Sequence, residues 1–180
     1  LSASRERLAS RFAVIIRYYI AAAFFLVVGA ILAGLVTVAM FDPGAPDWLT
    51  SARDRLTVAH AMAGVAGGGG LTMGGTMVTL GPTAMRTRMD PAAVSFATTA
   101  LPLWVAGLVT SEVGALIGSM RIASLGLLIV IGAAALGVGV PLGRAACAKG
   151  PSEYGAWSLV LGGAWILVAG AGACLHAFEA

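Results

Sequence analysis

Five long apolar runs, separated by short polar gaps, restrict what this chain can fold into. Hydrophobic residues make up 59% of the sequence and charged residues 11%, and the charges lie mostly in the gaps. A run of about 20 apolar residues matches the ~30 Å hydrocarbon core of a bilayer, where only helices and closed barrels pair all their backbone groups. The runs lack the period-2 alternation of barrel strands. We therefore predict an all-α integral membrane protein.

Breaks between the runs set the expected helix boundaries. Pro43 and Pro46 end the first run, and Gly81-Pro82 ends the second. The first run is far longer than the core of a signal peptide, so we expect a spanning helix there and not a cleavable signal. The predicted bundle is one domain, residues 1–180, with transmembrane helices at about 12–41, 56–80, 92–117, 122–142 and 154–176.

Basic residues are distributed unevenly between the two sides of such a bundle. Cytoplasmic loops carry an excess of Lys and Arg, so the richer side is expected to be inside. We predict a multi-pass protein of the plasma membrane with its amino terminus inside and its carboxyl terminus outside. The scattered positions of the basic residues do not indicate a nucleic-acid partner. The inner set is Arg5, Arg7, Arg11, Arg17, Arg86, Arg88, Arg144 and Lys149, and the outer set is Arg53, Arg55 and Arg121.

The two histidines of the chain are expected at one depth. His60 lies near the start of the second run and His176 in the last turn of the fifth, so both fall within about 10 Å of the outer boundary. Met40, Met62 and Cys174 are expected at the same level. Imidazole, thioether and thiolate are ligands of haem iron and of copper. We therefore predict His60, His176 and Met62 as cofactor ligands, and a metal set of His60, His176, Cys174 and Met40.

Each of these residues also has a plainer interpretation. The histidines can serve as interfacial residues bonded to headgroups or carbonyls, and Cys174 and Met62 as packing residues. Glu112 in the third run is either a functional intramembrane carboxylate or a boundary residue near Arg121.

The second run is unusually rich in glycine. Small residues at such spacing let two helices approach closely, and the same surface would admit a flat macrocycle. Both interpretations remain open from the sequence. The glycines are Gly64, Gly67, Gly68, Gly69, Gly70, Gly74 and Gly75.

Short motifs in and after the second run form a set. They are His60-Ala61-Met62, Gly70-Leu71-Thr72, Gly75-Thr76, Val78-Thr79-Leu80, Pro82-Thr83, Arg86-Thr87-Arg88-Met89, Ala100-Leu101-Pro102, Pro141-Leu142, Arg144-Ala145-Ala146 and Ala156-Trp157-Ser158, with Trp165. This set resembles a membrane module of actinobacterial proteins of the copper nitrite reductase and multicopper-oxidase types, where the module precedes an extracytoplasmic copper domain. The resemblance covers most of the chain.

In that module the second helix opens with His-Ala-His, similar to the paired histidines that hold two haems in large subunits of haem–copper oxidases. His60 matches the first histidine, whereas Met62 stands at the second. The module's tryptophan is replaced within residues 67–70. The resemblance therefore implies either one haem b, with His60 and His176 or Met62 as axial ligands, or loss of the site.

Two functions remain open at this stage. The favoured one is a membrane-embedded electron-transfer subunit that binds one haem b, or alternatively copper, near the outer face and serves an extracytoplasmic copper or haem protein. The alternative is a non-catalytic anchoring or packing subunit among other membrane subunits. The sequence shows no nucleophile–base pair or nucleotide loop, so we do not expect the chain to be an enzyme by itself. Transport is disfavoured because the midplane holds no charge.

Overall fold

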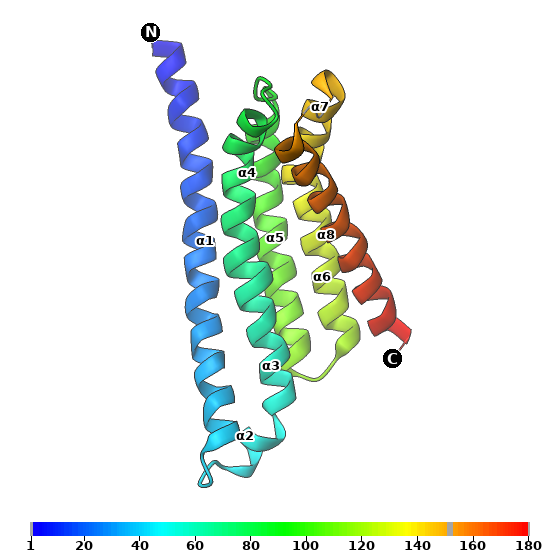
Figure 1. The fold of residues 1–180 in the computed structure, drawn as a ribbon. Coiled ribbons are helices and arrows are strands. Elements are labelled where there is room, and N and C mark those ends of the chain that lie inside the picture. The colour runs from blue at the N-terminus through cyan, green and yellow to red at the C-terminus, as the bar shows by residue number, and fades with distance from the viewer. Residues whose placement is uncertain (1, 151–152, 180) are drawn as a thin grey trace.

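The structure, a computed structural model, describes residues 2–150 and 153–179, with side chains for residues 12–148, 150 and 153–172. These residues form a bundle of long helical rods that run side by side and alternate in direction (Figure 1). Four of the described helices are long and apolar enough to cross a bilayer, namely Phe12–Phe41, Ala93–Leu116, Met120–Ala148 and Tyr154–Gly172. The prediction of an all-α, multi-pass membrane protein is confirmed at this level.

The first rod is a single helix, α1 (Ser2–Phe41), and its candidate membrane-spanning part, Phe12–Phe41, agrees with the predicted range of 12–41. Its buried residues recur at helical spacing and form one stripe against the second rod, with partly buried residues beside the stripe and an exposed opposite face. The helix ends just before Pro43, and the short helix α2 (Asp47–Ser51) follows with Trp48 exposed. The stripe comprises Val14, Ile15, Tyr18, Ala22, Phe25, Gly29 and Leu32.

The second rod is one continuous helix in three parts: α3 (Arg53–Ala61), the π-helical segment η1 (Met62–Gly69) and α4 (Gly70–Ala84). The predicted range of 56–80 is therefore too short at both ends. Pro82 was predicted to end this helix but lies inside α4. A proline within a helix removes one backbone hydrogen bond and can kink the helix without ending it. The rod stops only after Ala84, and Arg86 then takes a positive φ of 49°.

The third rod, α5 (Ala93–Leu116), turns through Gly118 into α6 (Met120–Ala134). Gly118 has a φ of 80°, a conformation that glycine adopts without strain. The fourth rod continues through the π-helical segment η2 (Ala135–Gly139) into α7 (Val140–Lys149). The predicted end at residue 142 is too early. Pro141 lacks an N–H, and the widened turns of η2 accommodate it without breaking the rod.

The last rod is α8 (Tyr154–Glu179), which packs against α6, α4 and α7. Figure 1 shows its carboxyl-terminal end leaning away from the bundle, and the two ends of the chain lie at opposite ends of the molecule. Two ion pairs join the loops at the other end of α8: Arg86 to Glu153 at 2.9 Å and Arg144 to Asp90 at 3.0 Å.

Candidate functional site

The glycine-rich surface of the second rod is filled by side chains from α1. A methyl group built at Gly67 would lie 2.6 Å from Phe25 Cβ, and one built at Gly75 would lie 2.8 Å from Tyr18 Cβ. Gly68 makes an equally close approach to Leu26. These glycines therefore serve close helix packing, as one of the two sequence interpretations predicted.

Trp104 of α5 covers the next part of the same surface. Its ring atoms lie 3.1 Å from a methyl group built at Gly74 and 3.3 Å from one built at Gly70. The indole Nε1 donates to the Ala66 carbonyl at 3.3 Å, within η1. Because π-helical turns disturb the regular i to i−4 bonding, their carbonyls are accessible to such donors. This role of Trp104 was not predicted, because the sequence does not reveal which side chains of the third run face the glycines.

Tyr18 lies fully buried where four helical segments meet. Its hydroxyl donates to the Ala97 carbonyl of α5 at 3.0 Å, so the buried polar group is satisfied. Its ring meets Trp104 edge-on, with ring centroids 6.2 Å apart. A methyl group built at Gly137 of η2 would lie 3.2 Å from the Tyr18 oxygen. Tyr18 thus joins α1 to α4, α5 and η2.

The haem b that the resemblance implies does not fit the glycine surface. A macrocycle on Gly67, Gly70 and Gly74 would occupy the volume that Phe25 and Trp104 already fill. Four aromatic or aliphatic side chains, from α1 and α5, hold that volume at van der Waals contact. The glycine surface is a helix-packing surface in this fold.

His60 lies part-buried at the end of α3, with Nδ1 2.9 Å from the Gly29 carbonyl oxygen of α1. A carbonyl can only accept, so Nδ1 carries the proton and donates. Gly29 has no side chain to keep the imidazole away from its backbone. A neutral imidazole held in this way keeps Nε2 free as an acceptor or ligand, which is how histidine ligands are commonly oriented. The same bond equally satisfies a histidine with a purely structural role.

The two methionines predicted beside His60 do not share its position. Met62 follows His60 by two residues on a helix, so their side chains project roughly 200° apart. Met40 lies on α1 beyond Gly29, and the axis advances roughly 16 Å between those residues at ~1.5 Å per residue. A single ion cannot take ligands from His60 and either methionine in this arrangement. Met40 is also largely exposed.

Cys174 and His176 belong to the last turns of α8, and their side chains lie outside the described residues. Their ligation therefore stays a prediction. The helix that carries them packs against α4, α6 and α7, whereas His60 lies on α3 beside α1. Among the described side chains, no three histidine, cysteine, aspartate or glutamate residues gather as a metal site would require.

The closest helix contact among the described rods joins α5 and α6. A methyl group built at Gly107 would lie 2.8 Å from the Gly126 carbonyl oxygen, and Gly126 in turn abuts the backbone of Ser111. Gly114 makes the same kind of contact with Ala123. The sequence analysis singled out the consecutive glycines of the second run and missed this pair, whose small residues are spread over two runs.

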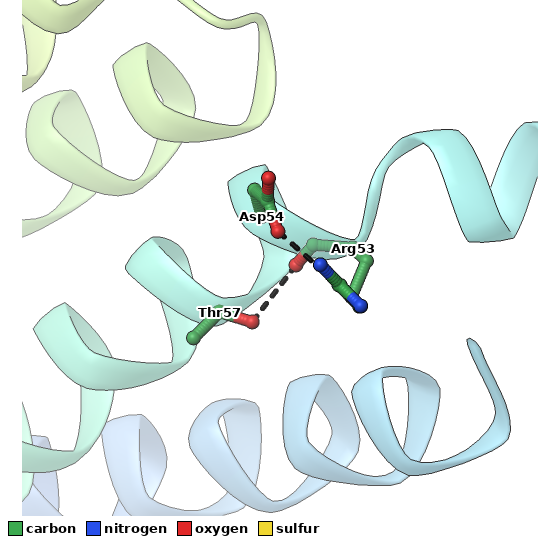
Figure 2. A network of polar contacts seen from close by, with 3 residues as sticks. All are labelled: Arg53, Asp54 and Thr57. Carbon is green, nitrogen blue, oxygen red and sulfur yellow. Dashed lines mark hydrogen bonds and ion pairs between the residues drawn. The ribbon is translucent and has the colours of Figure 1, made fainter. Parts of the chain in front are cut away.

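Charged side chains lie at both ends of the bundle. Figure 2 shows the start of α3, where Arg53 Nε donates to Asp54 Oδ1 at 3.2 Å and the Thr57 hydroxyl donates to the Arg53 carbonyl at 2.9 Å. At the opposite end, the Ala92 amide and the Arg144 guanidinium hold the pKa of Asp90 below its ordinary value of 3.8. Arg144 also lies over the Phe96 ring, 5.0 Å from its centroid.

No protein family, curated protein or solved structure matches this chain. The fold defines the chain as an all-helical, multi-pass membrane protein. The described part of its core is filled by the chain's own side chains.

Proposed function

We propose that this chain is a non-catalytic packing or anchoring unit of a larger membrane complex. One observation carries the non-catalytic part of the proposal: the glycine surface, the most distinctive feature of the sequence, is used for packing by the chain's own Tyr18, Phe25 and Trp104. A core filled in this way supports a rigid membrane scaffold. The resemblance to a module that precedes a copper domain favours an extracytoplasmic redox protein as the partner.

The scaffold that we propose crosses the plasma membrane five times. The rod α3–η1–α4 is roughly 45 Å long at ~1.5 Å per residue and runs beside α1 and α5, so it is long enough for a fifth span. Its glycines and threonines lower its mean hydropathy without adding charge. The excess of Lys and Arg on one side favours an inner amino terminus and an outer carboxyl terminus.

The native mass of the chain in a mild detergent tests this proposal. The chain alone accounts for 18.0 kDa. We expect native mass spectrometry of protein from its own membrane to find the chain bound to at least one other protein in a fixed ratio. A stable single chain, with no partner at any detergent concentration tried, would contradict the scaffold function.

The electron-transfer function favoured by the sequence is a second candidate, supported by the hydrogen bond from His60 Nδ1 to Gly29. That bond leaves Nε2 free to hold a metal centre, which would supply one-electron chemistry. The chain's own contribution would be to fix the tautomer and the ring plane. A cofactor there would lie at the rim of the bundle, because the glycine surface has no space for it.

Absorbance spectra distinguish this candidate from the scaffold. If His60 binds haem or copper, the purified chain supplied with that group gains a visible absorption that His60→Ala lacks. His176→Ala serves as the matched variant, since bis-histidine ligation requires both residues. An unchanged spectrum in His60→Ala would rule out His60 as the ligand.

A further inference from the structure

Glu112 is an acidic residue inside a membrane-spanning helix that the proposed function does not use. Among the described residues, no other Asp or Glu lies within the four spanning ranges. It sits one turn before Leu116, the last residue of α5. A carboxylate in such a segment is costly to keep ionised unless it is paired.

The surroundings of Glu112 are apolar on the side that faces α3. Leu108 and Ala115 lie on the same stripe of α5, and both are fully buried. Ala115 packs with Leu56 and Ala59 of α3. Within that packing the Glu112 Oε1 atom is buried and has no hydrogen-bond partner among the described residues. An ionised oxygen in this position would lose its hydration without compensation, at a far greater cost than a neutral, protonated carboxyl.

Arg55 is the cation nearest to Glu112 on α3. Its Nη1 donates to the Leu116 carbonyl at 3.4 Å, a long bond at the α5 terminus. Leu116 and Glu112 are four residues apart and so lie on the same side of α5, one turn of ~5.4 Å from each other. Arg53 is engaged with Asp54 instead (Figure 2). The guanidinium of Arg55 therefore lies beside the last turn of α5, next to the turn that carries Glu112.

Few other titratable groups face this position. His60 lies on α3 but turns to α1, where it donates to Gly29. Arg121 lies exposed in the first turn of α6, and α1 carries no charged residue between Arg17 and Asp42. Arg55 and Arg121 are thus the charges able to stabilise an ionised Glu112.

We propose that Glu112 is a proton-binding site at the Arg55 end of the bundle, and that its protonation decides the partner of Arg55. With the proton bound, the carboxyl stays neutral in its apolar setting and Arg55 bonds to the Leu116 carbonyl. When the proton leaves to water at that end of the bundle, the guanidinium moves to the carboxylate. The site takes a proton and requires no other ligand.

Site-resolved carbodiimide labelling tests the proposal. Dicyclohexylcarbodiimide is apolar and reacts with protonated carboxyl groups, so the full chain in lipid vesicles is treated over a range of pH and its peptides are analysed by mass spectrometry. We expect modification of Glu112 at low pH that declines as pH rises. Asp90 and Glu153, each paired with an arginine, serve as internal controls with little modification at neutral pH. Absence of modification at Glu112, or a yield independent of pH, would overturn the proposal.

Arg55→Gln tests the second half of the proposal. Removing the cation disfavours the ionised carboxylate, so the decline in Glu112 labelling should shift to higher pH. Arg53→Gln is the matched control, because Arg53 pairs with Asp54, and should leave the labelling profile unchanged. An identical pH profile of Glu112 labelling in wild type and Arg55→Gln would show that Arg55 does not interact with the ionised Glu112.

Discussion

At the scale of single residues, the fold depends on glycines that face large side chains. Gly67 and Gly64 both lie in η1, but only Gly67 meets a neighbour, whereas a methyl group at Gly64 would meet nothing within 4 Å. Alanine favours a helix over glycine by about 1 kcal/mol. A methyl group forced against a β-carbon costs about 1–3 kcal/mol. Comparing alanine substitutions at the two positions therefore separates the effect of helix propensity from the effect of packing.

We predict opposite effects of the same substitution at these two sites. Gly67→Ala should lower the free energy of unfolding, since the clash with Phe25 outweighs the gain in propensity. Gly64→Ala should raise it by up to about 1 kcal/mol. Unfolding by sodium dodecyl sulfate, followed by circular dichroism, measures both. Equal effects at the two sites would mean that Phe25 does not pack on Gly67.

The sequence predicted part of this residue-scale arrangement. It identified the glycine surface and its two uses, but not which side chains would fill it, because the partners Tyr18, Phe25 and Trp104 lie in other runs. The residue that completes the packing, Trp104, lies 34 positions after Gly70 and 30 after Gly74. Such contacts depend on helix register, which periodicity in a uniformly apolar run does not reveal.

At the scale of helices, the α5–α6 pair has the tightest contact that we describe. A methyl group at Gly126 would lie 2.6 Å from the Gly107 carbonyl oxygen, and backbone atoms cannot move aside as a side chain can. We predict that Gly126→Ala separates the pair and lowers the free energy of unfolding by about 2–3 kcal/mol. Gly132→Ala on the same helix meets nothing within 4 Å and is the control. The same detergent titration measures both variants, and comparable stabilities would contradict this contact.

We predict that Asp90, in the loop before α5, makes the free energy of unfolding depend on pH. The Ala92 amide and Arg144 lower the pKa of Asp90, so the folded state favours the carboxylate more than the unfolded state does. This contribution is complete above pH 3.8 and disappears as pH falls through the lower folded value. As pH falls from 3.8 through that lower value, wild type should therefore lose more stability than Asp90→Asn. Parallel pH profiles for the two proteins would contradict this assignment.

Helix boundaries show where sequence reasoning failed at this scale. We predicted that Pro82 ends the second helix, yet it lies within α4, and the fourth rod continues past both Pro141 and the predicted end at residue 142. At Pro141, the π-helical turns of η2 precede the proline and adjust the bonding that it disturbs. A proline in lipid is tolerated more readily than in water, because ending a helix there would expose unpaired backbone groups.

At the scale of the whole molecule, orientation in the membrane is the testable consequence of the charge pattern. Cys147 lies exposed on α7, at the end predicted to be cytoplasmic. With Cys174→Ser as background, a membrane-impermeant maleimide should label Cys147 only after the cells are permeabilised. Asp47→Cys in a cysteine-free background should be labelled in intact cells. The reverse pattern would invert the proposed orientation.

The membrane class follows from the sequence, whereas the function does not. Length and hydropathy of the runs determine helices that cross a bilayer, because lipid allows few alternatives. A cofactor site depends instead on a few side chains whose mutual positions follow from packing. The two-residue spacing of His60 and Met62 already places them on different faces of a helix, whereas the offset of Met40 follows from the contact between His60 and Gly29, which the sequence did not indicate.

The reduced-minus-oxidised visible spectrum of the purified chain, after supplementation with haem, tests the central claim most directly. Phe25 and Trp104 fill the glycine surface, and we propose that the chain serves as a scaffold. We therefore predict a flat spectrum in wild type and His60→Ala alike. A b-type band in wild type that His60→Ala abolishes would contradict the scaffold and establish the electron-transfer function in its place.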